Sequence, residues 1–333
     1  MKQSGPEFHI DYQEFVLEVH VIGYRTKGES IVVLLKEGIH TFYSIVIDSF
    51  CKRKNKKSLN RTSDVLTSNG VKTLQMVIMT HPHDDHIRGM VDILEHFCDK
   101  NTMFYSPAHS FDIERQMVQL TKKEKDILKC VRTINEKNKT FSNEVGVSFE
   151  GYYSLKKVYL YDNDDPYMHY PVTVEINAIS PITSLNDAKS SNIVLDPNDL
   201  SISIIICICD YYLLFGADTT DEQIRYFDSE TMSAVKFVKI PHHASNTSEH
   251  LLRYLAPGQL DYACSTSFHV GKSHLPLRTV LDHYSKVSRR VDYLGCKSNH
   301  KRKGYFGEIC YQFRLGPTNM ISNVQSIGIV NCK

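Results

Sequence analysis

The sequence has 333 residues and lacks tryptophan, a marked net charge and any regular spacing of its cysteines. The missing tryptophan excludes nothing. The net charge of +1 provides no overall field for nucleic acid or a membrane, so any such binding must come from local patches. The nine cysteines are an odd number without a Cys-x-x-Cys pair, which argues against a disulfide framework and for a reducing compartment.

Long apolar runs and a secretory signal are also missing. The longest apolar run, residues 202–209, is too short to span a bilayer and is followed by Asp210. Residues 1–7 have no apolar core of the kind that a secretory signal needs. Because 41% of the residues are hydrophobic, the chain can still bury a sizeable core. We therefore expect a cytoplasmic protein with no membrane partner.

A dense polar run stands out at residues 80–86, which read Thr-His-Pro-His-Asp-Asp-His directly after an apolar run. Imidazole and carboxylate groups are ligands for zinc, manganese or iron. His81 and His83 are two residues apart, so in an extended segment they project to the same side and could hold one ion. Asp85 and His86 follow where the chain should enter a helix and could reach a second ion. The alternative, a capping loop, needs only one such side chain.

The H-x-H-x-D-H spacing at 81–86 after an apolar strand resembles the signature of the metallo-β-lactamase superfamily. A pair of histidines, His242 and His243, follows the apolar residues 235–240 and resembles the last metal motif of that superfamily. Residues 242–245, His-His-Ala-Ser, resemble more narrowly the soluble hydrolase domain of ComEC-type DNA-uptake channels and its free-standing bacterial relatives. Those relatives typically have glycine where this chain has Ala244.

The resemblance implies a four-layer αββα sandwich, an α/β (α+β) fold, and covers about residues 15–314. We expect one hydrolase domain over 1–315 and leave 316–333 as an unassigned C-terminal tail. Apolar periodicity predicts strands over 15–22, 31–35, 44–49, 74–79, 103–105, 156–161, 172–179, 202–209, 212–215, 235–240, 262–265 and 308–313, and helices over 87–97, 121–138, 221–227 and 277–285.

The resemblance also implies two divalent ions, Zn²⁺ or Mn²⁺, and a set of side chains around them. The implied metal ligands are His81, His83, Asp85, His86, Asp218 and His243. Asp218 would bridge the two ions, because a carboxylate can offer one oxygen to each; its alternative role is to cap the helix that follows. Asp48 would orient a ligand histidine, or else cap a turn.

The resemblance implies a hydrolytic mechanism in which a hydroxide between the ions is the nucleophile, because metal binding lowers the pKa of water to about 7. The catalytic candidates are Asp85, His242 and His274. Asp85 would hold or receive the proton of the nucleophile, and His242 would support a ligand or contact the substrate. His274 and Lys272 would bind or protonate a phosphate-like leaving group, and Ser245 is a further candidate for substrate binding.

The sequence departs from the superfamily pattern at one metal ligand. Most members have a further ligand histidine between the first motif and the bridging aspartate, and neither His109 nor His169 has a convincing context here. The ComEC-type group also lacks a clear one. The first metal site is therefore expected to be short of a ligand, with solvent, Asp199 or Ser201 in its place.

Three classes of function fit these residues. The favoured one is a phosphodiesterase or nuclease acting on nucleic acid, with DNA preferred, in which the basic run beginning at Lys52, Arg53 and Lys54 contacts phosphates. The alternative is a small-molecule hydrolase acting on a cyclic nucleotide, lactone or thioester. The third is a non-catalytic subunit. A partner protein that delivers substrate is compatible with the first.

Overall fold

The computed structural model describes residues 5–54, 57–107, 142–148, 151–164, 170–182, 197–295, 305–315, 320–328 and 330–332, without the side chains of 53, 54, 57, 142, 144, 197, 321 and 332. The helix predicted over 121–138 lies outside these residues, as do His109 and His169. Within the described ranges, most strands belong to two large mixed sheets.

The eight-stranded sheet has the spatial order β20 (Met320–Gly328), β19 (Phe306–Leu315), β2 (Phe15–Tyr24), β3 (Glu29–Glu37), β4 (His40–Ile47), β7 (Met76–Ile78), β8 (Met103–Pro107) and β9 (Ser142–Val145). The nine-stranded sheet has the order β1 (Glu7–Ile10), β10 (Tyr153–Asp162), β11 (Val172–Ala178), β12 (Ile204–Ile208), β13 (Tyr211–Phe215), β14 (Val235–Lys239), β15 (Leu260–Thr266), β18 (Ser288–Leu294) and β21 (Val330–Cys332).

Two hairpins and several short helices complete the described part. The hairpins are β5 (Lys52–Lys54) with β6 (Lys57–Leu59), and β16 (Phe268–Val270) with β17 (Ser273–Leu275). The helices are α1 (Arg61–Ser68), α2 (Asp84–Ile87), α3 (Met90–Phe97), α7 (Asp221–Ile224), α8 (Ser229–Ala234) and α9 (Arg278–Val287), with 3-10 turns η1 (Pro197–Leu200), η2 (Pro241–Ala244) and η3 (Asn246–Tyr254). None of these described helices is long and apolar enough to cross a membrane.

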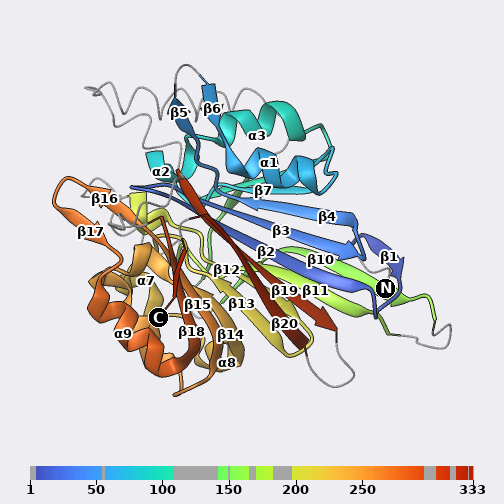
Figure 1. Cartoon of the computed structure of the whole chain (residues 1–333). Helices are drawn as coiled ribbons and strands as arrows, with labels where there is room; N and C mark the ends of the chain where they lie inside the picture. Colours follow the sequence, from blue (N-terminus) through green and yellow to red (C-terminus); the bar gives the residue numbers. More distant parts are fainter. Residues whose placement is uncertain are drawn as a thin grey trace.

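Alternation along β2 shows how the sheets are covered on both faces. Leu17, Val19 and Val21 point into the core between the two sheets, whereas Ile22 and Tyr24 pack in the outer cluster that includes α1 and α3. A third apolar cluster lies between the nine-stranded sheet and α7, α8, α9 and η3. Figure 1 shows the two helical layers on opposite sides of the paired sheets. The fold is therefore the αββα sandwich that the resemblance implied.

The predicted helix over 87–97 is wrong in its continuity, because the structure divides this segment into α2 and α3. The break lies at Gly89, whose backbone N–H donates to the Ser49 carbonyl over 2.8 Å. A Cβ atom at Gly89 would lie 2.7 Å from Ser49 Oγ and 2.8 Å from the carbonyl carbon of Phe50. The close approach of two backbones thus requires glycine here and ends α2 early.

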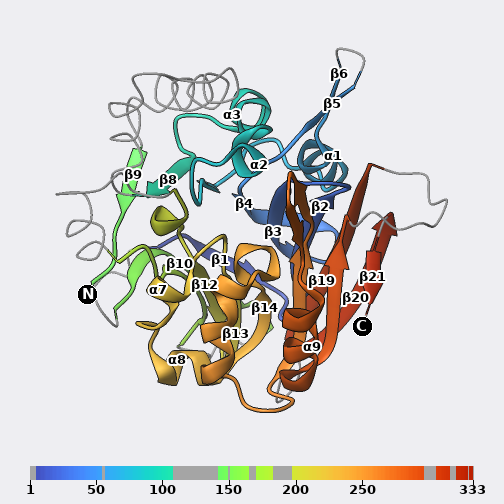
Figure 2. The ribbon, with the colours of Figure 1, turned by 90° about the vertical axis from the view of Figure 1, so that its left-hand side faces the viewer.

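The C-terminal residues that the sequence left unassigned enter both sheets. β20 pairs antiparallel with β19 in the eight-stranded sheet, and β21 pairs antiparallel with β18 in the nine-stranded sheet. Figure 2 shows these strands side by side with β19. The last described segment therefore joins the two halves of the sandwich.

Candidate metal centre

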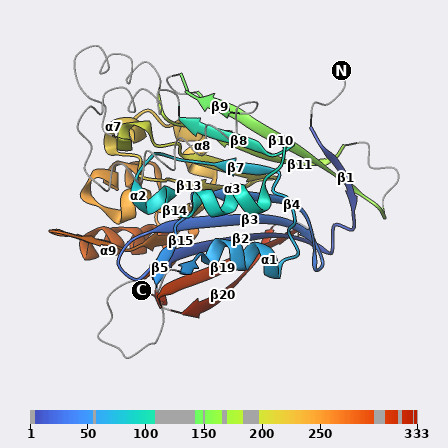
Figure 3. The same ribbon diagram turned by 90° about the horizontal axis from the view of Figure 1, so that it is seen from above.

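The candidate residues lie on loops at one edge of the sandwich. β4, β7 and β8 are parallel neighbours, and so are β13, β14, β15 and β18. Carboxyl ends of parallel strands meet at the same edge of a sheet. Asp48 and residues 80–86 follow strands of one sheet, and Asp218 and residues 241–245 follow strands of the other. Figure 3, seen from above, shows α2 at the same end of the molecule as α7.

Several loop residues there adopt the left-handed backbone conformation. The φ angles are 56° for Asp48, 45° for Ala217, 46° for His242, 51° for His243 and 57° for Ala244. For residues other than glycine this conformation costs roughly 1–2 kcal/mol, so the surrounding packing must hold it. Glycine would adopt the angle found at Ala244 without this cost.

Three side chains form one group of potential ligands. His81 Nε2 lies 3.0 Å from His83 Nδ1 and 3.6 Å from Asp218 Oδ2. All three donor atoms lie within 4.8 Å of one another, close enough to share one ion. His81 and Asp218 are buried and His83 is half-buried.

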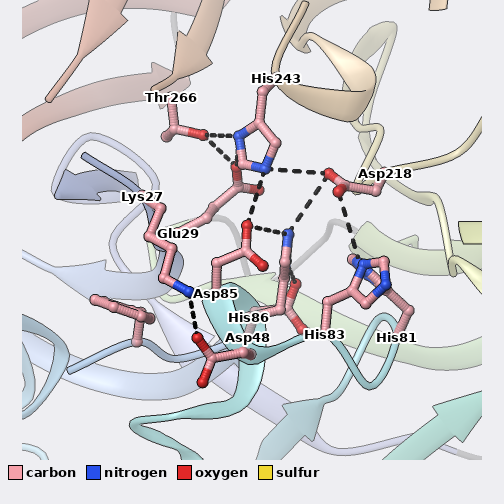
Figure 4. Close-up of polar contacts among 12 residues, drawn as sticks. Lys27, Glu29, Asp48, His81, His83, Asp85, His86, Asp218, His243 and Thr266 are labelled. Carbon is pink, nitrogen blue, oxygen red and sulfur yellow. Dashed lines mark hydrogen bonds and ion pairs between the residues drawn. The ribbon is translucent and has the colours of Figure 1, made fainter. Parts of the chain in front are cut away.

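A second group lies on the other side of the same aspartate. His243 Nε2 lies 3.4 Å from Asp85 Oδ2, and His86 Nε2 lies 3.9 Å from that oxygen. Asp218 Oδ1 is 3.5 Å from both of these imidazole nitrogens. The aspartate therefore offers one oxygen to each group, as Figure 4 shows. We call the six residues of the two groups the His–Asp cluster.

The cluster fits metal ions because its innermost atoms lack other partners. Asp85 Oδ2, His86 Nε2, Asp218 Oδ1 and His243 Nε2 are all buried and make no hydrogen bond. Buried polar atoms are otherwise nearly always paired, and leaving one unpaired costs about 1–3 kcal/mol. Four such atoms from two sheets, all nitrogen or carboxylate oxygen, are a donor set suited to Zn²⁺ or Mn²⁺.

The outer nitrogens of the histidines determine which nitrogen faces the cluster. His86 Nδ1 donates to Asp48 Oδ2 over 2.7 Å. The Thr80 hydroxyl donates to the same carboxylate, and the Thr80 backbone N–H donates to Asp48 Oδ1 over 2.7 Å. Because the hydroxyl proton is used there, His81 Nδ1, 3.0 Å away, is the donor to Thr80 Oγ1. His81 therefore turns an unprotonated Nε2 inward, and the Asp48 carboxylate holds His86 with its Nε2 on the same side, which is the orienting arrangement predicted for Asp48.

A second supporting chain stands behind His243, and the sequence alone did not indicate it. His243 Nδ1 lies 2.8 Å from Thr266 Oγ1, whose hydroxyl donates to Glu29 Oε2. The same Glu29 oxygen forms an ion pair with Lys239 Nζ, and both side chains are at most 1% exposed. The one sequence feature that could have indicated this chain of contacts is Lys239, a lysine within the apolar residues 235–240 that precede His242.

The charges in the cluster complement one another. Burial alone would lower the pKa of His86, but the carboxylates of Asp218 and Asp48 raise it well above its ordinary value. Burial and the charge of His86 lower the pKa of His81 well below its ordinary value. For Asp218, burial alone would raise the pKa, and the neighbouring His243 and His86 hold it well below its ordinary value. The Asp218 carboxylate is thus ionised and can bind cations.

The remaining predicted residues lie around the cluster rather than in it. His242 is half-buried and its Nδ1 lies 2.7 Å from Thr247 Oγ1, which in turn lies 2.8 Å from Ser245 Oγ. Lys272 and His274 are exposed on the β16–β17 hairpin, where His274 Nδ1 lies 3.3 Å from His269 Nδ1.

That hairpin reaches the cluster through one aromatic ring. Phe268 stacks on His243 with ring centroids 5.4 Å apart. Lys52 begins the β5–β6 hairpin, which projects near α1 in Figure 2, and the side chains of Arg53 and Lys54 lie outside the described residues.

The segment before β12 passes close to the first group. The Ile202 N–H donates to the Thr80 carbonyl over 3.0 Å, and Thr219 Oγ1 donates to the Ser201 carbonyl over 3.3 Å. Ser201 Oγ is buried without a hydrogen-bond partner. Asp199 lies on η1, where its carbonyl accepts from the Gln223 amide over 2.8 Å. The backbone at Ser201 and Ile202 is therefore hydrogen-bonded to Thr219 and Thr80, the residues next to Asp218 and His81 in the sequence.

No protein-family model and no curated protein matches the sequence. The solved structures that are similar at a low level include the following two. One, described as a new diphosphatase from the PhnP family, is 10% identical, covers 83% of this chain and 87% of its own, and has a TM-score of 0.38. The other, AidC, a dizinc quorum-quenching lactonase in complex with a product, is 14% identical, covers 63% of this chain and 74% of its own, and has a TM-score of 0.32. At sequence identities and TM-scores this low, neither similarity assigns a function to this chain.

Proposed function

We propose that this protein is a metal-dependent hydrolase whose His–Asp cluster binds two divalent ions and cleaves phosphodiesters, with DNA as the favoured substrate. The main support is the convergence of four buried, unpaired donor atoms from both sheets, with Asp218 shared between two ligand groups. A retired site would have no reason to keep so many polar atoms buried and unpaired. The spacing of the motifs and their resemblance to the metallo-β-lactamase superfamily point in the same direction.

The ligand roles divide between the two groups. His81, His83 and Asp218 would hold one ion, and Asp85, His86 and His243 the other, with Asp218 bridging. When bound, such ions supply Lewis-acid stabilisation of a phosphoryl oxygen and an acidified water as nucleophile.

The chain's own residues orient the donors and handle the proton. Asp48 and Thr266 hold His86 and His243 with Nε2 toward the ions. Asp85, whose Oδ2 faces both imidazoles, would hold the proton of the nucleophile. Among the described residues, the first group offers three protein donors, and Ser201 or solvent would complete it. An incomplete nitrogen and oxygen set is compatible with either Zn²⁺ or Mn²⁺.

The preference for a phosphodiester over a neutral ester rests on charge. Two dications held by two carboxylates leave a net positive centre, which attracts an anionic substrate. Beside the cluster, Lys27 and Arg88 both pair with the single carboxylate of Asp84, which leaves a further positive charge at this rim. Cys51 Sγ lies 3.4 Å from the Arg88 carbonyl. The basic hairpin, which starts at the next residue, Lys52, therefore begins close to Arg88.

Hydrolysis of a substrate panel tests the proposal directly. Purified protein loaded with zinc or manganese would be assayed on single-stranded and duplex DNA, RNA, cyclic nucleotides, a lactone and a generic phosphodiester. We expect cleavage of DNA that Asp85→Ala abolishes and that Asp64→Ala, a matched change of an exposed aspartate on α1, leaves intact. Turnover of the lactone or cyclic nucleotide alone would favour the small-molecule alternative. No turnover of any substrate by the protein with two ions bound would contradict the proposal.

The basic hairpin offers a separate test of the polymer substrate. Replacing Lys52, Arg53 and Lys54 together by glutamate should weaken DNA binding and flatten its dependence on salt. Turnover of a small phosphodiester should be unaffected, because the hairpin supplies none of the cluster residues. An unchanged affinity for DNA would place the nucleic-acid path elsewhere on the surface.

A further inference from the structure

A second group of potential ligands lies on the outer face of the eight-stranded sheet, away from the loops at its edge. Even-numbered residues of β2 point to this face, and Cys310 of β19 is paired directly opposite His20. Glu18, His20 and Cys310 are each buried, at 7%, 8% and 8% exposure. Their donor atoms lie within 4.8 Å of one another, and none of the three belongs to the His–Asp cluster. We call these residues the outer triad.

Two of the three distances in the outer triad are those of ligands on one tetrahedral ion. With Zn–N and Zn–O bonds of about 2.0–2.2 Å and a Zn–S bond of about 2.3 Å, tetrahedral angles place N and O about 3.3 Å apart and N and S about 3.6 Å apart. His20 Nε2 lies 3.4 Å from Glu18 Oε2 and 3.7 Å from Cys310 Sγ. These two distances match two edges of a zinc tetrahedron. Glu18 Oε2 also accepts a hydrogen bond from Lys36 Nζ over 3.1 Å, and an incoming ion would take the place of that bond.

His20 Nδ1, the ring nitrogen that faces away from Glu18 and Cys310, hydrogen-bonds to a carboxylate, as the second nitrogen of a zinc-bound histidine commonly does. His20 Nδ1 donates to Glu308 Oε1 over 2.9 Å, and the other Glu308 oxygen accepts from Arg61 Nε. A carboxylate behind a ligand histidine fixes the ring and raises its basicity. The second oxygen of Glu18 accepts from Gln312 Nε2 over 2.8 Å. Each potential ligand from β2 is thus held in place by a partner of its own.

The charge state of Glu18 also suits a cation. Burial alone would raise the pKa of this carboxyl, but the hydrogen bond with His20 and the charge of Lys36 hold it at about 2. The carboxylate is therefore ionised at neutral pH.

A cavity opens beside the outer triad. Its volume is about 220 Å³, and its lining includes the three ligands together with Lys36, Gln325 and Ile327. Zinc sites with three protein ligands keep their fourth position for water or another small ligand. A water molecule in this cavity would complete the tetrahedron, and the Gln325 side chain is available on the wall.

We propose that Glu18, His20 and Cys310 bind a single Zn²⁺ ion at a site separate from the His–Asp cluster. The ion would link β2, near the start of the chain, to β19, near its end, and would leave one position open to the cavity under α1. The donor set of one carboxylate, one imidazole and one thiolate favours zinc over magnesium or calcium.

Cobalt substitution tests the site, because Co²⁺ bound to a thiolate has a sulfur-to-metal charge-transfer band in the near ultraviolet. The His–Asp cluster contains no sulfur and cannot produce that band. Full-length protein loaded with Co²⁺ should show the band, and Cys310→Ser should remove it. Cys207→Ser, a matched change on β12 outside the triad, should keep it. The absence of the band in the wild type, or its persistence in Cys310→Ser, would overturn the proposal.

Zinc content and one outer-shell variant provide an independent readout. The wild type should retain one zinc equivalent more than Cys310→Ser after dialysis, with unchanged circular dichroism. Glu308→Gln keeps all three ligands, so it should lower zinc affinity about 10–100-fold while preserving the cobalt–thiolate band. Equal zinc content in the wild type and Cys310→Ser would show that the triad is only a hydrogen-bonded ion network. These readouts do not depend on hydrolytic activity, so they remain valid whatever the His–Asp cluster does.

Discussion

Asp48 combines an unfavourable backbone angle with several hydrogen bonds to its carboxylate. Its φ of 56° is strained for an aspartate, yet its two oxygens serve the Thr80 N–H, the Thr80 hydroxyl and His86 Nδ1. Burial raises its pKa, and the charge of His86 offsets part of that rise. Because these hydrogen bonds hold a strained backbone angle, we infer that the angle serves to position the carboxylate rather than to stabilise the loop.

Asp48→Asn should separate orientation from ligation. The amide keeps the shape but removes the charge behind His86, so metal affinity should fall about 10–100-fold with little change in fold. Competition titration against a chelating dye would measure the affinity, with Asp64→Asn as the exposed control. An affinity equal to that of the wild type would show that Asp48 serves only the turn.

Lys239 and Glu29 form the most buried ion pair around the cluster, with at most 1% of either side chain exposed. Lys239→Met leaves the Glu29 carboxylate buried without its cation, so the free energy of unfolding should fall by about 3–5 kcal/mol. Lys157→Met, in the partly exposed pair with Glu175, should lower it by only about 0–1 kcal/mol. Urea unfolding of both variants measures the difference.

The double variant of Lys239→Met and Glu29→Gln isolates the effect on His243. Removing both charges should recover much of the stability, because no uncompensated charge remains. Metal affinity should stay reduced, since Thr266 loses its charged acceptor and His243 its fixed tautomer. Full recovery of both properties would mean that the pair has no role beyond packing.

At the scale of elements, β20 and β21 stabilise the fold from the end of the chain. β20 covers the edge of β19, and β21 pairs with β18 in the other sheet. Truncation after residue 315 exposes β19 as a long edge strand, so the shortened protein should aggregate during size-exclusion chromatography. Truncation after residue 328 keeps β20 and should remain monodisperse with a lower melting temperature. Equal behaviour of the two shortened chains would contradict this assignment of roles.

At the scale of the whole molecule, the His–Asp cluster joins the two halves of the sandwich. His81, His83, Asp85 and His86 follow a strand of one sheet, whereas Asp218 and His243 follow strands of the other. Ions that bind only when both halves are in place stabilise the folded state, by about 2.7 kcal/mol when their concentration is 100 times the dissociation constant.

A chelator should therefore lower the melting temperature of the loaded protein by a few degrees. Asp218→Ala removes the ligand shared by both groups, so the variant should lose most of this shift and keep only the part that zinc in the outer triad supplies. Asp228→Ala, which alters only the cap of α8, should keep the full shift. Differential scanning calorimetry at fixed protein concentration provides the comparison, and an equal shift in Asp218→Ala would contradict the bridging role.

The sequence by itself predicted the strands next to the site and the contiguous group of candidate ligands, and the resemblance added the sandwich. It did not predict β1, β9, β18, β20 or β21. Residues 80–86 could be assigned because strand, loop and ligands are adjacent in the chain, so local periodicity and side-chain chemistry suffice. Asp218 and His243 could be added through the resemblance. The sequence did not indicate the break at Gly89, because that break depends on the backbone of Ser49 and Phe50 approaching from another strand. Only the tertiary structure decided which distant residues meet. Glu29 reaches Lys239 and Thr266 across the two sheets, and His20 faces Cys310 across 290 residues. Such pairs depend on strand register and sheet packing, which bring together residues that no local pattern connects.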